Sequence, residues 1–270
     1  MAEKVDLYDN AYANHALDLY REVRMETYGE DFGQTSWVSN RESKDIPRLL
    51  DLNKDSAVLE IGCGSGAYAL HLAQTEGCSI TGLDVNSAGI RNANDVVVAR
   101  GLESRARFEE CDVSKGLPFE DGKFDAVFSN DVLCHIPGRL KLLVEIFRAL
   151  KPGGRMLFSD ALVIAGMVSH EEIATRSSIG FYVYAPLAEN ERLLELAGFS
   201  EITARDTTGN AVEIAKRWYQ ARADREVNLV KVEGENNFHG LQRFLSCVRT
   251  LTSERRLLRM VYTARKGSIA

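Results

Sequence analysis

One segment constrains the fold of this chain more than any other: Val58-Leu59-Glu60-Ile61-Gly62-Cys63-Gly64-Ser65-Gly66. The apolar run 57–61 predicts a buried strand that ends at glycine, and 67–74 predicts the helix that follows. Glycines spaced one residue apart form a tight turn in which the backbone approaches a ligand without Cβ interference, and the helix offers free N–H groups. Three-glycine turns also bind dinucleotides, so the turn alone leaves the cofactor open.

A second predicted strand, 79–83, ends in Asp84, where an acidic residue would accept hydrogen bonds from both hydroxyls of a ribose. The glycine spacing is Gly-x-Gly-x-Gly with Glu60 just before it, not Gly-x-Gly-x-x-Gly. On these residues the sequence resembles the class I S-adenosylmethionine-dependent methyltransferases. The resemblance implies S-adenosyl-L-methionine as methyl donor and S-adenosyl-L-homocysteine as product.

The resemblance continues after the third predicted strand, 106–110. There it implies that Asp112 accepts a hydrogen bond from the adenine amino group and that the N–H of Val113 meets the ring. The stretch 117–125 resembles the family's entry into the fourth strand, with a characteristic Phe124-Asp125. The residues expected to contact the cofactor are Glu60, Gly62, Cys63, Gly64, Gly66, Asp84, Val85, Asp112, Val113 and Asn130.

Strands alternate with helices from Ser56 onwards, which predicts a mostly parallel sheet with right-handed crossovers. We expect an α/β fold: a Rossmann-like, seven-stranded, mostly parallel sheet with helices on both faces, an N-terminal helical cap and a helical insertion before the last strand. The predicted strands are 57–61, 79–83, 106–110, 124–129, 154–160, 199–206 and 257–265. The predicted helices lie near 67–75, 86–100, 138–150 and 188–197.

The chain divides by pattern into four parts. Residues 1–54 are expected to hold the N-terminal helices and a lid, and 55–206 the cofactor-binding core, within which 161–186 covers the substrate. Residues 207–254 form a helical insertion, and 255–270 return as the last strand. Apolar residues recur at helical spacing from Tyr8 to Val23, predicting one amphipathic helix that ends near Gly29. The irregular segment 31–39, with Trp37, is either a lid over the ligand or a surface connector.

Composition limits the partners. The net charge of −6 and pI of about 5.5 argue against nucleic acid. No apolar run approaches the ~20 residues that span a membrane, and the N-terminus lacks an apolar signal core. The five scattered cysteines predict reduced thiols without a zinc site, and no metal is expected. We expect a cytoplasmic monomer or homodimer that acts on a small-molecule methyl acceptor.

The fourth predicted strand leads into Ser129-Asn130-Asp131-Val132-Leu133-Cys134-His135-Ile136, which faces the expected place of the methyl acceptor. His135 titrates near neutral pH and could take a proton, with Asp131 as an orienting or cation-binding carboxylate. The alternative is a histidine that only packs over the cofactor. Methyl transfer itself mainly requires that the acceptor lone pair be held behind the methyl group and that water be excluded.

A narrower resemblance, to the phosphoethanolamine methyltransferases, runs through Phe32-Gly33, Asp131 with His135, and Ser159-Asp160 to the C-terminal tail. It implies that an N-terminal tyrosine pairs with His135 to position and deprotonate the acceptor. Tyr28 is our candidate, with Tyr12 the other possibility. It also implies that Arg176 corresponds to the phosphate-binding arginine and that Asp160 lies at the substrate site, and Trp37 of the expected lid is a further candidate for substrate contact. The chain departs from that family at Ala161 and Ser178, where tyrosines are expected, which puts phosphoethanolamine itself in doubt.

The chain offers other aromatic residues instead. Phe181, Tyr182 and Tyr184 could surround a cationic amine through cation–π contacts, or could simply belong to the core. We therefore predict methylation of a small molecule, with nitrogen of a small amine or amino acid as favoured acceptor and oxygen second. C-methylation of a lipid, quinone, sterol or polyketide-type substrate is the alternative. A non-catalytic S-adenosylmethionine-binding partner subunit is the remote alternative.

Overall fold

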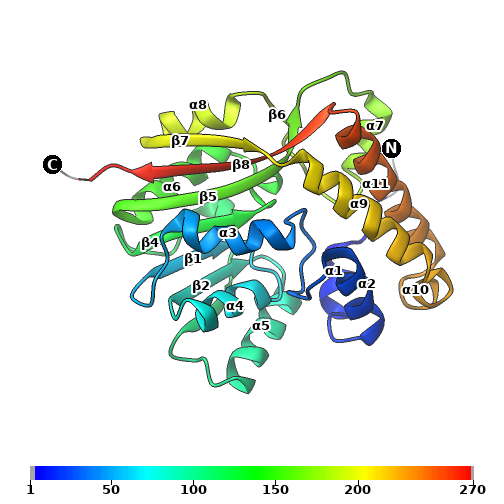
Figure 1. Ribbon diagram of the computed structural model, residues 1–270, viewed down its shortest axis with the longest axis horizontal. Coiled ribbons are helices and arrows are strands. Elements are labelled where there is room, and N and C mark those ends of the chain that lie inside the picture. The colour runs from blue at the N-terminus through cyan, green and yellow to red at the C-terminus, as the bar shows by residue number, and fades with distance from the viewer. Residues whose placement is uncertain (1–3, 269–270) are drawn as a thin grey trace.

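The computed structural model describes residues 4–268 and places one large mixed β-sheet at the centre of the molecule (Figure 1). The strand order is β3-β2-β1-β4-β5-β8-β7, with the short β6 paired to β5. Strands β1 to β6 pair in parallel, whereas β8 runs antiparallel to β5 and β7. The strands are β1 (Ala57–Ile61), β2 (Ser79–Asp84), β3 (Ala106–Glu110), β4 (Phe124–Asn130), β5 (Leu150–Ile164), β6 (Ala185–Pro186), β7 (Phe199–Asp206) and β8 (Leu257–Lys266).

The strand order reverses between β1 and β4. From β1 the chain steps outward to β2 and β3, then returns to place β4 on the other side of β1. In open α/β sheets, ligands bind beyond the carboxyl ends of the strands at such a switch point. The glycine turn after β1 and the segment after β4 both lie there.

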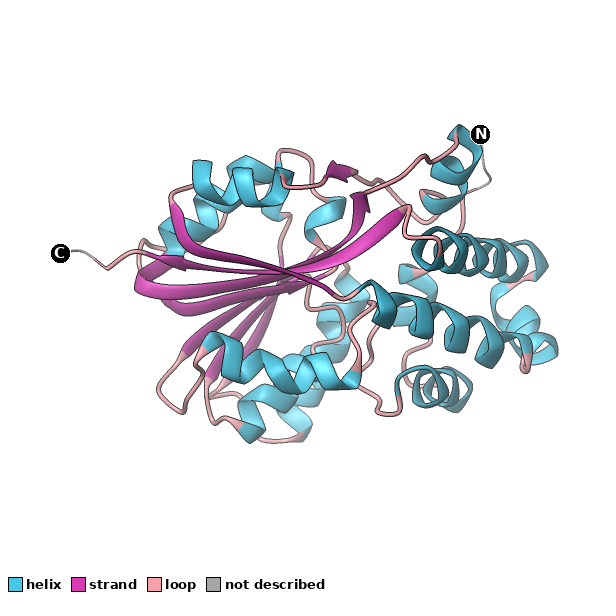
Figure 2. Cartoon of the chain, turned by 45° about the horizontal axis from the view of Figure 1, so that its top comes forward, coloured by secondary structure: helices cyan, strands magenta, loops and turns pink. Residues whose placement is uncertain are grey.

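Helices cover both faces of the sheet (Figure 2). The α-helices are α1 (Tyr8–Ala13), α2 (Asp18–Tyr28), α3 (Asn40–Leu50), α4 (Ala67–Thr75), α5 (Ser87–Ala99), α6 (Arg139–Ala149), α7 (His170–Arg176), α8 (Glu189–Leu196), α9 (Thr208–Ala223), α10 (Glu226–Glu233) and α11 (Glu235–Ser253). Two short 3₁₀ helices, η1 (Val113–Lys115) and η2 (Leu133–His135), follow β3 and β4.

Alternating side chains of the strands enter two separate cores. Leu59 of β1 and Val127 of β4 pack with α6 and α8 on one face, while their neighbours Val58 and Phe128 pack with α3, α4 and α5 on the other. This is the two-residue period of a strand that is buried on both sides. The double burial explains why the central strands read as continuous apolar runs in the sequence.

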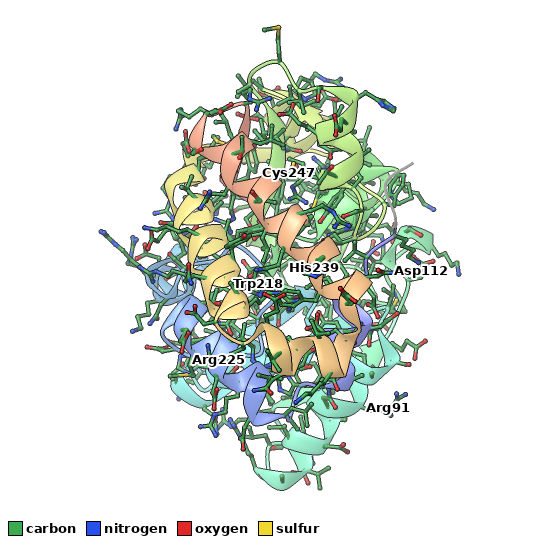
Figure 3. The ribbon with its side chains drawn as sticks, turned by 90° about the vertical axis from the view of Figure 1, so that its right-hand side faces the viewer. Arg91, Asp112, Trp218, Arg225, His239 and Cys247 are labelled. Carbon is green, nitrogen blue, oxygen red and sulfur yellow. The ribbon has the colours of Figure 1, made fainter. Side chains whose placement is uncertain are left out.

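A third core lies beyond the carboxyl ends of the strands. Helices α2, α9 and α11 pack there around Trp218 and Phe244, and Figure 3 shows α9 and α11 side by side with α10 joining them. Arg225, at the junction of α9 and α10, pairs with Glu22 and Glu26 of α2. The N-terminal helices and the segment 208–253 therefore share one helical layer next to the cavity described below.

The structure confirms the predicted fold class, and the strands 57–61, 106–110 and 199–206 have the predicted bounds. Strand β5 is longer than predicted, and β6 is an additional short strand. The single N-terminal helix is corrected to two helices, because the chain leaves helical conformation after Ala13 and re-enters it at Asp18. The side chain of Asn14 there donates to the Asn10 carbonyl, a local bond that competes with continued helix.

Candidate active site

A cavity of about 710 Å³ opens at the switch point. Its walls come from the N-terminal segment 4–12, the loop 32–38, the glycine turn, and the segments after β2 and β4. Of the residues predicted to form the site, those lining this cavity are Glu60, Gly62, Cys63, Gly64, Asp84, Val85, Asn130, Asp131 and His135. The rest of the wall includes the loop 31–39, predicted to be either a lid over the ligand or a surface connector, and the N-terminal segment, of which only a tyrosine was expected near His135.

The glycine turn has no room for side chains. Gly62 and Gly64 adopt left-handed backbone conformations, with φ of 77° and 54°. A Cβ added to Gly62 would lie 2.2 Å from the Val132 side chain, and one added to Gly64 would lie 2.7 Å from the Tyr12 hydroxyl oxygen. Both glycines are therefore required by conformation and by close approach.

Two carboxylates face the turn. Asp84 is fixed by the backbone, because its oxygens accept from the N–H groups of Gly64 and Asn86, each at 2.8 Å. Burial raises the pKa of Asp84, and these hydrogen bonds oppose the rise. Glu60 is buried, and its Oε2 has no hydrogen-bond partner among the described residues. Burial, with a smaller contribution from Asp84, raises the pKa of Glu60 to about 8.

Three residues predicted to bind the cofactor lie outside this cavity. Gly66 packs against Ala93 and Phe108 under the turn. Val113 is buried in the core. Asp112 lies toward solvent at the side of the molecule (Figure 3), where it pairs with Lys115 and caps η1. Their predicted roles toward adenine stay predictions.

His135 is held by hydrogen bonds at both ring nitrogens. Nδ1 lies 3.0 Å from the backbone oxygen of Phe181, and Nε2 lies 3.0 Å from the hydroxyl oxygen of Tyr8. A carbonyl only accepts, so Nδ1 carries the hydrogen and Nε2 accepts from Tyr8. The Tyr8 oxygen keeps its lone pairs, and both residues line the cavity.

Burial keeps both groups of this pair neutral. It lowers the pKa of His135 to about 4; the nearby charge of Arg176 also lowers it, whereas the bond to the Phe181 carbonyl opposes the change. The pKa of Tyr8 is raised well above its ordinary value, first by burial and then by Tyr182. The sequence-based expectation that His135 titrates near neutral pH is corrected accordingly.

The tyrosine beside His135 is Tyr8, which corrects the assignment of Tyr28. The Tyr28 side chain is buried under the loop, and its hydroxyl donates to the Ser36 carbonyl. Tyr12, the other tyrosine considered, lies against Gly64 instead. One signal was available: Tyr8 stands one helical turn before Tyr12, on the same face of α1.

Asp131 also has a different partner from the one expected. Its carboxylate pairs with Arg259 of β8 and accepts from the Trp37 N–H at 2.8 Å, and it makes no hydrogen bond to His135. Trp37 itself does not line the large cavity: its ring packs against Trp218 and Phe244. Asp131 is thus a cavity residue that orders the loop rather than the histidine.

Asp160, predicted to bind substrate, is completely buried away from the cavity. It pairs with Arg139 at 2.7 Å and accepts from the side chain of Asn190. A carboxylate that is neutralised inside the protein is not available to a ligand. The assignment of Asp160 to the substrate site is therefore corrected.

One of the predicted aromatic residues, Tyr182, contacts a cation of the chain itself, Arg176. The Arg176 guanidinium carbon lies 4.7 Å from the centre of the Tyr182 ring and 5.1 Å from that of Phe244. Tyr184 bonds to Ser177, and the side chain of Phe181 is 59% exposed. None of the three predicted aromatic residues lines the large cavity, so they do not form the expected box for an amine.

Arg176 is nevertheless placed next to the site. It is 1% exposed, forms no salt bridge within residues 4–268, and its Nη1 lacks a hydrogen-bond partner there. It lines a void of about 10 Å³ together with Tyr8 and Asp131, which both also line the large cavity. Tyr182 lies between Arg176 and the Tyr8–His135 pair: it also lines this void, and its ring lies 4.3 Å from that of His135.

These features fit a nucleoside with an amino-acid tail. The glycine turn leaves backbone open to the ligand, Asp84 presents a fixed carboxylate, and the unpartnered oxygen of Glu60 suits an ammonium group. Within the described residues there is no group of three or more histidine, cysteine or acidic side chains that could hold a metal ion. None of the helices that the structure describes has the length and apolarity needed to cross a bilayer.

Residues 59–158 match the family described as methyltransferase domain. The chain is 26% identical to 27-O-demethylrifamycin SV methyltransferase of Amycolatopsis mediterranei over 203 residues, which cover 71% of this chain and 74% of that protein. It is 27% identical to a phosphoethanolamine N-methyltransferase of Triticum aestivum over 190 residues, 70% of this chain but only 36% of that protein. The chain thus spans about a third of the wheat protein's length.

The fold is also similar to that of a solved structure. Phosphoethanolamine N-methyltransferase 2 of Haemonchus contortus, in complex with phosphomonomethylethanolamine and S-adenosylhomocysteine, superposes with a TM-score of 0.80. The match covers 97% of this chain and 60% of that one, at 23% identity. At that identity the likeness concerns the fold.

Proposed function

The chain belongs to the class I S-adenosylmethionine-dependent methyltransferases, and we propose that it methylates the nitrogen of a small amine or amino acid that also carries an anionic group. It is an enzyme of the methyltransferase class with S-adenosylmethionine as cofactor. The observation that carries the proposal is the ordered line from the Phe181 carbonyl through His135 to Tyr8, which ends at the cavity wall.

When bound, S-adenosylmethionine supplies a methyl group on a positively charged sulfur. We assign its amino-acid and ribose parts to the residues around the glycine turn: Glu60 to the ammonium group, Asp84 to the ribose hydroxyls, and the backbone of Gly62 and Gly64 to close contact. Asp112 and Val113 remain our candidates for the adenine end, because β3 is paired with β2 and both strands end on this side of the sheet.

The line of hydrogen bonds defines what the acceptor must do. The Tyr8 hydroxyl donates its hydrogen to His135, so toward a ligand its oxygen can only accept a hydrogen bond. An N–H group of the methyl acceptor is the matching donor. That bond would hold the nitrogen in place and turn its lone pair away from Tyr8, as an in-line attack requires. A proton leaving the acceptor would pass to the Tyr8 oxygen while the Tyr8 proton passes to Nε2 of His135.

The buried Arg176 supports an anionic group at the far end of the acceptor. An unpaired charge in the interior is expensive, and a partner usually offsets it. Arg176 has no such partner in the described chain, and it lies behind the Tyr8–His135 pair. A carboxylate or phosphate a short distance from the amine would complete the pair.

Oxygen is the second candidate acceptor, because a hydroxyl can donate to Tyr8 in the same way as an amine. The cavity of about 710 Å³ is within the range of sites for larger molecules, and the alignment with the rifamycin methyltransferase covers most of both chains. C-methylation of a lipid or polyketide-type substrate is less well supported, since it gives the Tyr8–His135 pair no hydroxyl or amine to orient.

Transfer of labelled methyl groups from S-adenosylmethionine tests the proposal. Each acceptor is supplied with a matched partner: phosphoethanolamine with ethanolamine, glycine and sarcosine with their amides, and each amine with the corresponding alcohol. We expect methylation of amines, reduced when the anionic group is removed. Labelling of phenols, macrolides or sterols with no labelling of any amine would refute the nitrogen assignment.

A further inference from the structure

We infer that Arg259, in the last strand of the sheet, is a positioning residue that fixes the loop 31–39 over the cavity by bridging Asp131 and Glu42. Arg259 does not line the cavity and its side chain is only 1% exposed, so it cannot touch a ligand there. Its influence on the site must pass through its partners. The inference rests on the proposed methyl transfer only where ligand binding is measured.

Arg259 joins two carboxylates from distant parts of the chain. Its Nε donates to both oxygens of Asp131, at 3.0 and 3.2 Å, and its Nη1 donates to Glu42 Oε1 at 2.6 Å and Thr207 Oγ1 at 2.8 Å. Asp131 follows β4, Glu42 is in the first turn of α3, and Arg259 comes from β8. A guanidinium suits this place, because its fixed fork of donors reaches several acceptors at once.

Each carboxylate in turn holds the end of the loop that leads into α3. Asp131 Oδ2 accepts from the Trp37 N–H at 2.8 Å. Glu42 Oε2 accepts from the Ser39 N–H at 3.0 Å in a capping box. The residues of this loop that line the cavity, Phe32, Gly33, Gln34, Thr35, Ser36 and Val38, lie next to these two anchors.

The electrostatics of the group favour the arrangement. Burial acts to raise the pKa of Glu42, but attraction to Arg259 and the Ser39 N–H outweigh it, and the pKa lies below its ordinary value. Asp131 has a left-handed backbone, φ 59°, which is uncommon without glycine. One guanidinium shared by two carboxylates leaves a net negative charge beside a cavity whose cofactor carries a positively charged sulfur.

These hydrogen bonds lead to a specific expectation for the loop 31–39. If Arg259 is removed, Asp131 is left as a buried carboxylate without its counter-ion, and it will reorient toward the cavity and water. The Trp37 N–H then loses its partner, and the loop is released at its C-terminal end. A residue that merely filled the core would instead weaken the whole sheet evenly.

Hydrogen exchange with Arg259→Met, Arg259→Lys and wild-type protein, all without ligand, tests the inference. We expect the Trp37 amide to exchange about 10- to 100-fold faster in Arg259→Met, relative to amides of β1 and β4, the loss expected for a hydrogen bond to a charged group. Arg259→Lys should lie between, because lysine can neutralise one carboxylate but not bridge both. Asp131→Asn, which keeps Arg259, should release the same amide and serves if Arg259→Met does not fold.

Arg139→Met is the matched control. Arg139 is equally buried and paired with Asp160, but makes no hydrogen bond to the loop. It should lower the melting temperature while leaving relative exchange at Trp37 within about twofold, as for independent sites. Calorimetry with S-adenosylhomocysteine should show roughly tenfold weaker binding in Arg259→Met. The released loop must then be ordered on binding, which we expect to cost about the net free energy of one hydrogen bond.

Two results would overturn the inference: unchanged exchange at Trp37 in folded Arg259→Met, or faster exchange of all amides alike. Failure of the wild-type protein to bind S-adenosylhomocysteine would count against the proposed function instead. The exchange measurement without ligand would still decide the role of Arg259.

Discussion

The hydroxyl oxygen of Tyr8 lies 3.0 Å from Nε2 of His135, although 127 positions separate the two residues in the chain. The contact joins the first helix to the segment after β4, and both residues line the cavity. The other ring nitrogen of His135 bonds to the Phe181 carbonyl, so the ring is oriented with Nε2 toward Tyr8. The methyl transfer proposed above would use this pair, which neither segment could form alone.

The first prediction concerns this pair. Tyr8→Phe and His135→Asn should each lower turnover by about 10²- to 10⁴-fold, the usual contribution of acid–base catalysis, with little change in cofactor affinity. Turnover at saturating cofactor and calorimetry with S-adenosylhomocysteine measure the two effects. The double variant should be no worse than the poorer single variant, because the residues act as one unit. Losses below about tenfold would leave only packing roles.

The second prediction concerns pH. The pKa of His135 is about 4 in the folded protein, below the ordinary value of roughly 6.5. The unfolded chain therefore takes up a proton at His135 first, and folding stability should decline as pH falls from about 6.5 toward 4. Turnover should stay level through pH 6.5. Melting temperatures of wild type and His135→Asn across this range provide the check, and a shared slope would contradict the assignment.

The third prediction concerns cofactor binding. Asp84→Ala should weaken S-adenosylmethionine binding by about 1.5–3 kcal/mol, the range for hydrogen bonds to a charged group. Gly64→Val should weaken it further, since a side chain there meets the Tyr12 hydroxyl and the backbone has φ of 54°. Calorimetry measures both, with melting temperature as the control for folding. Wild-type affinity in either folded variant would remove the support for this cofactor pose.

The core of the fold was predictable because its signals are local. A strand buried on both faces is an apolar run, and the glycine turn and Asp84 mark where two such strands end. The N-terminal helix was less predictable, because its apolar period continues across the break at 14–17. Only the finished fold shows that α1 must turn there to set Tyr8 against His135.

The partners within the site were not predictable from spacing. Tyr8, Tyr12 and Tyr28 carry equal chemistry in the sequence, and the shared helical face of Tyr8 and Tyr12 does not decide which one reaches His135. Arg259 is a charged residue in a buried strand. Its position is explained only by the carboxylates of Asp131 and Glu42, which come from two other segments. The aromatic run at 181–184 does not form the predicted box for an amine; of its residues only Tyr182 contacts a cation, and that cation is Arg176, a contact fixed by tertiary structure.

The fourth prediction concerns Glu60. Its pKa of about 8 lies above the ordinary value near 4.3, so between these values the folded protein holds a proton that the unfolded chain has released. Stability without ligand should therefore fall as pH rises from about 4.5 to 8, and level off above that. Glu60→Gln should flatten this slope, while Asp55→Asn, an exposed acid, should not. Equal slopes in wild type and Glu60→Gln would show that Glu60 is ionised throughout.

The last prediction concerns Arg176. Its guanidinium is buried against Tyr182 and Phe244 with no carboxylate partner in the described chain, so aromatic rings rather than a counter-ion offset the cost of burying its charge unless a ligand joins it. Arg176→Met keeps a flexible unbranched side chain, shorter than that of arginine, and removes the charge. We expect the variant to be as stable as wild type or more stable, and its KM for an anionic amine to rise at least tenfold. The corresponding amine without the anionic group should react equally with both proteins, because it has no group that pairs with Arg176.

Arg222→Met is the control, since Arg222 is equally buried but paired with Glu233, and its loss should lower the melting temperature. If Arg176→Met instead melts well below wild type and its KM for both amines is unchanged, Arg176 is a structural cation held by its aromatic neighbours, and the acceptor needs no anionic group.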